Sequence, residues 1–127
     1  MQREVLRGKI HRATVTEADL EYEGSLTVDA ALMECAGLAM YERIDVYNIT
    51  NGNRFSTYLI EGPRGSGTIC VNGAAAHLAS AGDRIIITGY GLATEADLKN
   101  HQPRVVLVDD KNRIRHVLRE STGARMP

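Results

Sequence analysis

The hydrophobic positions fall in short runs separated by polar turns, a pattern typical of a chain built mainly from β-strands. Residues 43–49 alternate polar and apolar side chains, and residues 54–60 resume the alternation after the turn at residues 50–53. The Asn-Gly pair in that turn is the strongest short-range signal for a β-hairpin. The alternation predicts one face carrying Arg54, Ser56 and Tyr58 and the opposite face carrying Phe55 and Thr57.

The other predicted strands are shorter or less regular. Residues 1–15 predict a bent or bulged strand with Gly8 as its weak point. Residues 83–90 carry the apolar centre Ile85-Ile86-Ile87, which predicts burial on both faces. Further predicted strands occupy residues 68–71, 104–108 and 113–118, and the last two flank a turn as a second hairpin.

Three short helices are expected between the strands. Asp29 is the predicted N-cap of a helix over residues 30–36, with Leu32, Met33 and Ala36 buried and Gly37 at its C-terminal cap. An Ala-rich helical turn is expected over residues 74–79, and a brief helix capped by Thr94 over residues 94–100. The tail at residues 120–127 is expected to be loose. About seven short strands would favour a closed barrel, because closure removes the exposed strand edges.

Composition and charge narrow the class of protein. The chain has 127 residues, 43% hydrophobic and 24% charged, so we expect one soluble domain over residues 1–127. Its net charge of -1 provides no general basic field for nucleic acid or an anionic membrane. No signal peptide or membrane-length apolar run is visible, which favours a cytoplasmic location. Two cysteines are too few for a disulfide framework or a four-cysteine zinc site. The four histidines do not have the spacing of metal ligands, which argues against a metal site.

The first candidate for chemistry is the pair Gly24-Ser25, before a β-prone run. An isolated Gly-Ser pair is usually a turn. The alternative is autocatalytic backbone chemistry, in which the Ser25 hydroxyl attacks the carbonyl carbon of Gly24. Glycine favours that attack because it has no Cβ to crowd the approach. The resulting ester can eliminate to dehydroalanine, which hydrolyses to a pyruvoyl group and ammonia, leaving the chain cut after Gly24.

Two other segments carry candidate binding groups. Arg54 has the planar fork that suits a carboxylate, and Tyr58 stays protonated at neutral pH and can donate a proton. The alternative for this strand is a polar, solvated hairpin face. The segment from Asn72 to His77 opens a helix with small residues that expose backbone N–H groups to an anion. Its alternative is a tightly packed helix start, with His77 as a core histidine.

Four segments together resemble the bacterial aspartate 1-decarboxylase family, in order and with that family's spacing. They are Lys9 with His11, Tyr22-Glu23-Gly24-Ser25, residues 51–58, and residues 72–77, and the resemblance spans Met1 to about Tyr90. It implies a pyruvoyl-dependent enzyme that makes β-alanine for pantothenate and coenzyme A. It also implies a six- to seven-stranded double-psi β-barrel that assembles as a homotetramer of processed units.

The resemblance also implies a role for each matching residue. Ser25 would become the pyruvoyl group, and cleavage would leave a β chain of residues 1–24 and an α chain of residues 25–127. Tyr58 would be the proton donor, and Thr57 would hydrogen-bond the Gly24 carbonyl oxygen and contact substrate. Substrate would be bound by Lys9, Arg54, Asn72 and the segment Gly73, Ala74 and Ala75, with His11 and Tyr22 as supporting groups.

The implied reaction joins the amine of L-aspartate to the ketone at residue 25 as a Schiff base, which accepts electrons as CO2 leaves. Alternation places the neighbours Thr57 and Tyr58 on opposite faces. Both can serve if one faces its own subunit's site and the other completes a site across an interface. A maturation partner and a non-enzymatic barrel that binds or assembles without self-processing stay open as alternatives. A small DNA-binding module is disfavoured by the charge of -1.

Overall fold

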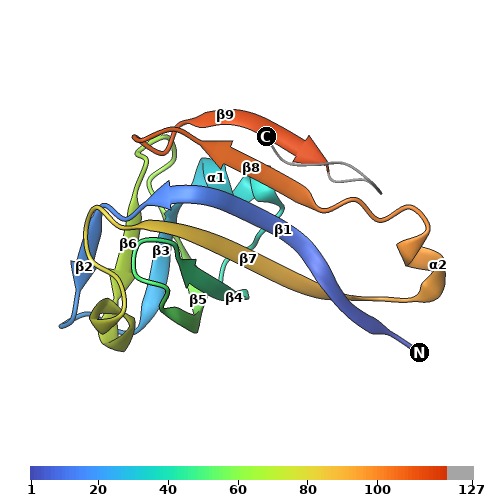
Figure 1. Cartoon of the computed structure of the whole chain (residues 1–127), viewed down its shortest axis with the longest axis horizontal. Helices are drawn as coiled ribbons and strands as arrows, with labels where there is room; N and C mark the ends of the chain where they lie inside the picture. Colours follow the sequence, from blue (N-terminus) through green and yellow to red (C-terminus); the bar gives the residue numbers. More distant parts are fainter. Residues whose placement is uncertain (120–127) are drawn as a thin grey trace.

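The computed structural model describes residues 1–119, which form one nine-stranded sheet with three short helices (Figure 1). The strand order is β2-β6-β3-β5-β4-β7-β1-β8-β9. The strands are β1 (Arg3–Thr14), β2 (Glu17–Asp19), β3 (Ser25–Asp29), β4 (Arg43–Asn48), β5 (Arg54–Gly62), β6 (Ile69–Asn72), β7 (Arg84–Ala93), β8 (Arg104–Val108) and β9 (Ile114–Arg119). The helices are α1 (Ala30–Ala36), the 3-10 helix η1 (Gly73–His77) and α2 (Glu95–Leu98).

The prediction of a mainly β chain is confirmed, whereas the count of about seven strands is too low for the described residues. The three-residue strand β2 is too short to produce an alternation signal, and β3 begins at the Gly-Ser pair that resembles a turn. Over residues 1–119 the end strands β2 and β9 each have one neighbour and do not pair with each other, so the sheet is not closed there. The predicted loose tail, residues 120–127, lies outside the described residues.

The core lies between the inward faces of the strands and α1. Fully buried side chains from distant segments meet there: Ile10, Leu26, Leu32, Met33, Ile44, Leu59, Ile69, Ile85 and Ile87. Each contributes about 1.5–3 kcal/mol by leaving water. The expectation that residues 85–87 are buried on both faces is wrong for Ile86, which is only partly buried. Ile86 pairs with Tyr47 on the opposite face of the sheet from Ile85 and Ile87.

Strand β1 has the bulges that the sequence predicts. Its antiparallel register with β7 shifts between Leu6 and Gly8 and again between Ile10 and Ala13. A Cβ added to Gly8 would lie 2.1 Å from the Ala36 carbonyl oxygen. Glycine at this position therefore lets β1 pass directly against the end of α1. The same strand pairs in parallel with β8, so β1 and β7 form the long centre of the sheet in Figure 1.

The predicted turns and caps are confirmed. Strands β4 and β5 pair antiparallel around the Asn-Gly turn, and β8 pairs antiparallel with β9. The Asp29 carboxylate caps α1 by accepting from the Ala31 N–H at 2.8 Å, and Thr94 forms a reciprocal capping box with Asp97. The Ala-rich turn is a five-residue 3-10 helix, shorter than predicted. None of the helices within residues 1–119 has the length and apolar character needed to cross a bilayer.

Candidate active site

The fold brings Ser25 against Asn72, although they are 47 residues apart in the chain. Ser25 opens β3 and Asn72 ends β6, and the two are direct partners in the antiparallel register. Asn72 Nδ2 donates to Ser25 Oγ at 3.0 Å and to Thr27 Oγ1 at 3.0 Å. Only 1% of Ser25 is exposed, so its hydroxyl is held by a side-chain amide away from bulk water.

The backbone of Gly73 packs against the backbone of Gly24. Gly73 has a φ of +71°, and a Cβ added there would lie 2.6 Å from Gly24 Cα and 3.0 Å from the Tyr22 carbonyl oxygen. Only glycine combines that conformation with such a close approach. By contrast, a Cβ added to Gly24 would meet nothing within 4 Å. The two motifs singled out from the sequence therefore form one site around the bond between residues 24 and 25.

Thr57 and Tyr58 lie on β5, the strand that pairs in parallel with the strand beginning at Ser25. Strand β3 pairs in parallel with β5 through Leu26 and Leu59. Continuing that register by one residue, to the start of β3, sets Tyr58 level with Ser25, and Thr57 is the preceding residue of β5. Thr57 pairs with the buried Ile44 on β4, whereas Tyr58 pairs with the exposed Arg43, so they occupy opposite faces as predicted.

Arg54 and Lys9 lie on the same outward face as Tyr58. The Arg54 guanidinium carbon lies 5.1 Å from the centre of the Tyr47 ring, which is within the range for a cation–π contact. The Tyr47 hydroxyl is in turn 2.9 Å from the Tyr90 hydroxyl. Lys9 pairs with Thr88, which pairs with Asp45 on the next strand. Direct partners share a face, so Lys9 belongs to this outward surface.

Within one chain these cationic side chains do not meet Ser25. Four strand spacings separate β1 from β3 in the sheet order, or roughly 19 Å along the sheet. Arg54 precedes Tyr58 by four residues, or roughly 13 Å along β5. A cavity of about 230 Å³ opens on the outward face instead. It is lined by Glu4, Arg43, Ile44, Asp45 and Tyr90, none of which the sequence singled out.

The remaining predicted residues differ in their surroundings. His11 is half-buried, and burial, followed by the charges of Lys9 and Arg12, lowers its pKa. Its imidazole is therefore neutral at pH 7. The Tyr22 side chain is 57% exposed, and this residue approaches Gly73 through its carbonyl oxygen. In η1, Ala74 is exposed and Ala75 is half-buried.

Sequence reasoning missed two members of the Ser25 network. Thr27 shares the Asn72 amide with Ser25, and the Cys70 thiol donates to Asn72 Oδ1 at 3.0 Å. Thr27 lies two residues after Ser25, and Cys70 lies two residues before Asn72. In a β-strand, side chains two residues apart point to the same face of the sheet. Applying that period to Ser25 and Asn72 would have found both.

The fold and the site define a class: a mainly β protein with a buried Gly-Ser junction held by an Asn-Gly segment. A profile of the family described as "Aspartate decarboxylase" matches residues 1–115. Relatives named aspartate 1-decarboxylase are 59% identical over 111 residues in Caldicellulosiruptor saccharolyticus and 62% identical over 110 residues in Leptospira biflexa. The matches cover 87% of each chain in the first case, and 86% of this chain and 93% of the relative in the second.

The relative of the same name from Bordetella avium is 55% identical over 117 residues, which are 92% of this chain and 96% of the relative. The family profile and these relatives cover most of the described residues. This chain belongs to the aspartate decarboxylase family.

Proposed function

We propose that this protein converts L-aspartate to β-alanine and CO2 in the cytoplasm, for pantothenate biosynthesis, with a pyruvoyl group made from its own Ser25. Family membership supports the reaction. The observation that carries the self-processing is the buried Ser25 hydroxyl, held by Asn72 beside the Gly24 backbone. A double-psi barrel is the topology we propose for the complete fold.

Self-processing begins with attack of Ser25 Oγ on the Gly24 carbonyl carbon. The bond from that carbon to the Ser25 nitrogen breaks, the nitrogen takes the hydroxyl proton, and an ester remains. Loss of the Ser25 Cα proton then breaks the bond from Cβ to the ester oxygen. Gly24 leaves as a carboxylate, and residue 25 becomes dehydroalanine, which takes up water and releases ammonia. The whole sequence consumes one water and releases one ammonia.

The chain's own groups support the first step. Asn72 Nδ2 fixes the position of Ser25 Oγ and stabilises the negative charge that Oγ gains as its proton leaves. Thr57, on the strand β5 that pairs with β3, is the proposed donor to the Gly24 carbonyl oxygen as that oxygen becomes an oxyanion. One such donor contributes about 3–4 kcal/mol in enzymes of known mechanism. Gly24 itself leaves the approach open, because it has no Cβ.

The surroundings of residue 25 fit a pyruvoyl group. The Asn72 amide, which now donates to Ser25 and to Thr27, and the Thr27 hydroxyl would remain as polar partners for a ketone oxygen. Because Gly73 has no side chain, the Gly24 backbone lies directly against it, next to the bond that is proposed to break. When present, the pyruvoyl group supplies a ketone conjugated with an amide carbonyl, which accepts electrons as the substrate carboxylate departs.

We assign substrate binding and protonation of the substrate to side chains on the outward face. Arg54 would bind a substrate carboxylate through its planar fork, Lys9 would add a second positive charge, and Tyr58 would protonate the substrate at Cα. The pocket wall would come from Asn72 and the backbone of residues 73–75. Lys9 is four strands from Ser25 in one chain, which supports a homotetramer in which Lys9 and Arg54 of one subunit complete the site of another.

The direct test compares wild type with Ser25→Ala and with Ser80→Ala, an exposed serine as matched control. Each protein is incubated with L-aspartate, and β-alanine is measured by chromatography. Wild type and Ser80→Ala should cut themselves and form β-alanine, whereas Ser25→Ala should stay intact and inactive. A Ser25→Ala chain that still forms β-alanine would contradict the proposal. An intact, inactive wild type would favour a barrel that binds or assembles without self-processing.

A further inference from the structure

A buried thiol ends the hydrogen-bonded network that leads to Ser25. Cys70 Sγ donates to Asn72 Oδ1 at 3.0 Å, and Asn72 Nδ2 donates to Ser25 Oγ and Thr27 Oγ1, each at 3.0 Å. Cys70 is 9% exposed and Asn72 is 3% exposed. The Asn72 amide therefore meets one sulfur through its oxygen and two hydroxyls through its nitrogen.

These partners differ in how strongly they orient the amide. The oxygen and NH2 ends of an asparagine side chain have nearly the same shape, so hydrogen-bond partners decide which end points where. The hydroxyls of Ser25 and Thr27 can donate or accept, and so they tolerate either orientation. A thiol is a weak donor and a weak acceptor, and the contact observed here is the S–H of Cys70 with Asn72 Oδ1 at 3.0 Å. Cys70 is therefore the partner that favours oxygen toward the sulfur and nitrogen toward Ser25.

The orientation matters for the chemistry of Ser25. With Nδ2 facing it, Ser25 Oγ accepts a hydrogen bond, and its own proton is free to move to the departing nitrogen. With the amide reversed, Oγ would donate that proton to Oδ1. The negative charge growing on Oγ would then face an oxygen instead of an N–H donor.

We propose that Cys70 is a positioning residue for self-cleavage, whose S–H group fixes the Asn72 amide with Nδ2 directed at Ser25 Oγ. This inference rests on the proposed function, because it takes Ser25 as the processed residue. Cys70 acts through Asn72 and touches neither the bond that breaks nor the substrate.

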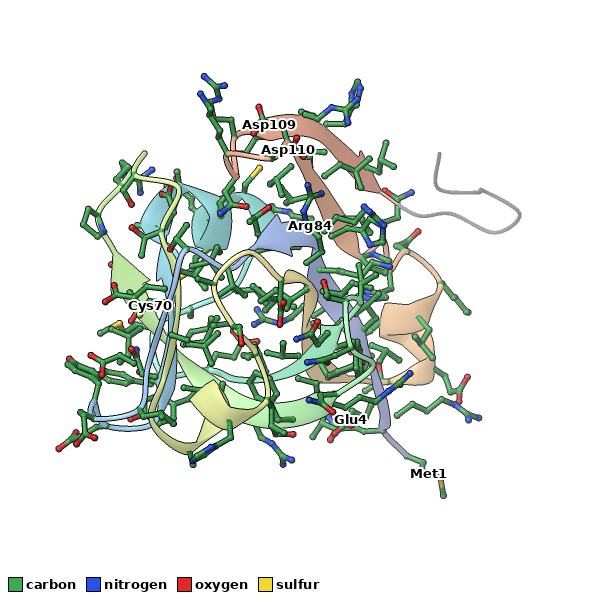
Figure 2. The ribbon with its side chains drawn as sticks, turned by 60° about the vertical axis from the view of Figure 1, so that its left-hand side comes forward. Met1, Glu4, Cys70, Arg84, Asp109 and Asp110 are labelled. Atoms are coloured by element: carbon green, nitrogen blue, oxygen red, sulfur yellow. The ribbon has the colours of Figure 1, made fainter. Side chains whose placement is uncertain are left out.

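The surroundings of the thiol keep it protonated. Glu17 is the partner of Cys70 in the parallel register between β2 and β6, and Asp19 is the partner of Asn72. Burial, followed by the negative charges of Glu17 and Asp19 and by a side-chain hydrogen bond with Glu17, raises the pKa of Cys70. Figure 2 shows Cys70 on the opposite side of the molecule from Met1 and Glu4. Glu4 lines the cavity on the outward face, so that cavity lies away from Cys70. A change at Cys70 is therefore expected to alter cleavage and leave that cavity intact.

The test follows the conversion of newly made chains to fragments 1–24 and 25–127. Wild type, Cys70→Ser and Cys70→Val are produced by cell-free translation, and the fragments are measured by mass over time. Serine keeps a donor, but its hydroxyl also accepts, so the productive orientation of the amide should remain about half populated. Valine fills the buried space without a donor. Cys70→Ser should cleave within about twofold of wild type, and Cys70→Val roughly three- to tenfold more slowly, as expected for one lost hydrogen bond.

A merely structural role predicts a different order of rates. If Cys70 only fills space in a buried strand, valine should be tolerated at least as well as serine. Equal cleavage rates for Cys70→Val and Cys70→Ser would therefore overturn the inference. An uncut wild-type chain would overturn the proposed function itself. The two failures are distinguishable, because the first requires a wild type that cleaves.

A double variant tests whether Cys70 acts through Asn72. In an Asn72→Ala background, Cys70→Val should cause no further slowing, whereas slowing of the same size as in wild type would overturn the inference. Thermal unfolding of each variant shows whether it folds. If Cys70→Val does not fold, Cys70→Ala replaces it as the variant without a donor.

Discussion

Gly73 is the residue that joins the two segments on which the proposed chemistry depends. Its φ of +71° turns the chain from β6 into η1, and its Cα surface lies against Gly24. A side chain there would meet backbone atoms, which cannot rotate away as a flexible side chain can. The contact therefore fixes the backbone beside the bond that is proposed to break.

Gly73→Ala should destabilise the fold and slow self-cleavage. The matched control is Gly82→Ala, because Gly82 also has a positive φ, of +92°, but an added Cβ there meets nothing within 4 Å. Both variants carry the strain of a positive φ, and only Gly73→Ala adds the clash. Urea denaturation should show Gly73→Ala less stable than Gly82→Ala by about 1–3 kcal/mol. Equal stabilities and equal cleavage rates would contradict the described contact.

At this scale the sequence identifies candidates for the proposed chemistry by residue type, but it does not predict their contacts. Gly24 with Ser25 and Asn72 with Gly73 stand out by residue type, because glycine, serine and asparagine in these orders suit backbone chemistry. The bond from Asn72 to Ser25 depends on which strands pair, and no local pattern fixes that pairing. Cys70 does not stand out by residue type, and only its position two residues before Asn72 on the same strand face identifies it.

Among the secondary-structure elements, the junction between β3 and α1 depends on one carboxylate. Asp29 accepts from the N–H groups of Ala31, Gly65 and Gly67, at 2.8, 2.9 and 2.9 Å. Burial alone would raise the pKa of Asp29, but these N–H donors and the charge of Arg64 outweigh it, so the net pKa is lowered. The carboxylate thus ties the helix start to the loop before β6.

Asp29→Ala should cost about 2–4 kcal/mol of unfolding free energy at pH 7, because a helix cap and two loop contacts are lost. A lowered native pKa stabilises the fold above the unfolded value of 3.8, and this contribution is lost as the pH falls through 3.8 toward the native value. Denaturation at several pH values should therefore show the difference between wild type and variant shrinking below pH 3.8. Asp110→Ala, an exposed carboxylate, is the control. A difference that stays constant with pH would contradict this account.

The sequence predicts the turns and helix caps, which depend on neighbouring residues. It does not predict which strands pair across long stretches of chain. The Asn-Gly hairpin and the caps at Asp29 and Thr94 depend on residues a few positions apart. The parallel pairings of β3 with β5 and of β1 with β8 join segments more than 25 residues apart. Strand β2 exists only because β6 pairs with it, so its own three residues carry no signal.

Across the whole molecule, the proposed substrate-binding cations and the proposed cleavage site are separate in one chain. Lys9 shares the outward face with Arg54 and Tyr58, while Ser25 lies four strands from Lys9. The sequence predicts the residue types of both groups and the mainly β class. It does not predict this separation, nor that β9 has a single neighbouring strand within residues 1–119, because both follow from the strand order.

Mixed oligomers should reveal whether sites are shared between subunits. Lys9→Ala and Ser25→Ala chains should each be inactive alone, and co-expression should restore part of the wild-type activity, since one chain supplies the pyruvoyl group and the other supplies Lys9. The control pairs Lys9→Ala with a chain carrying both substitutions, and it should stay inactive. No recovery in oligomers that native mass spectrometry shows to be mixed would contradict the shared site.

The most direct test of the central claim is the denatured intact mass of freshly purified protein. Self-processing predicts two species, a fragment of residues 1–24 and a larger one lighter by one ammonia than a chain that begins with Ser25. A larger fragment that retains the full serine mass would mean simple hydrolysis without a ketone. That result, or a single uncut chain, would contradict the account.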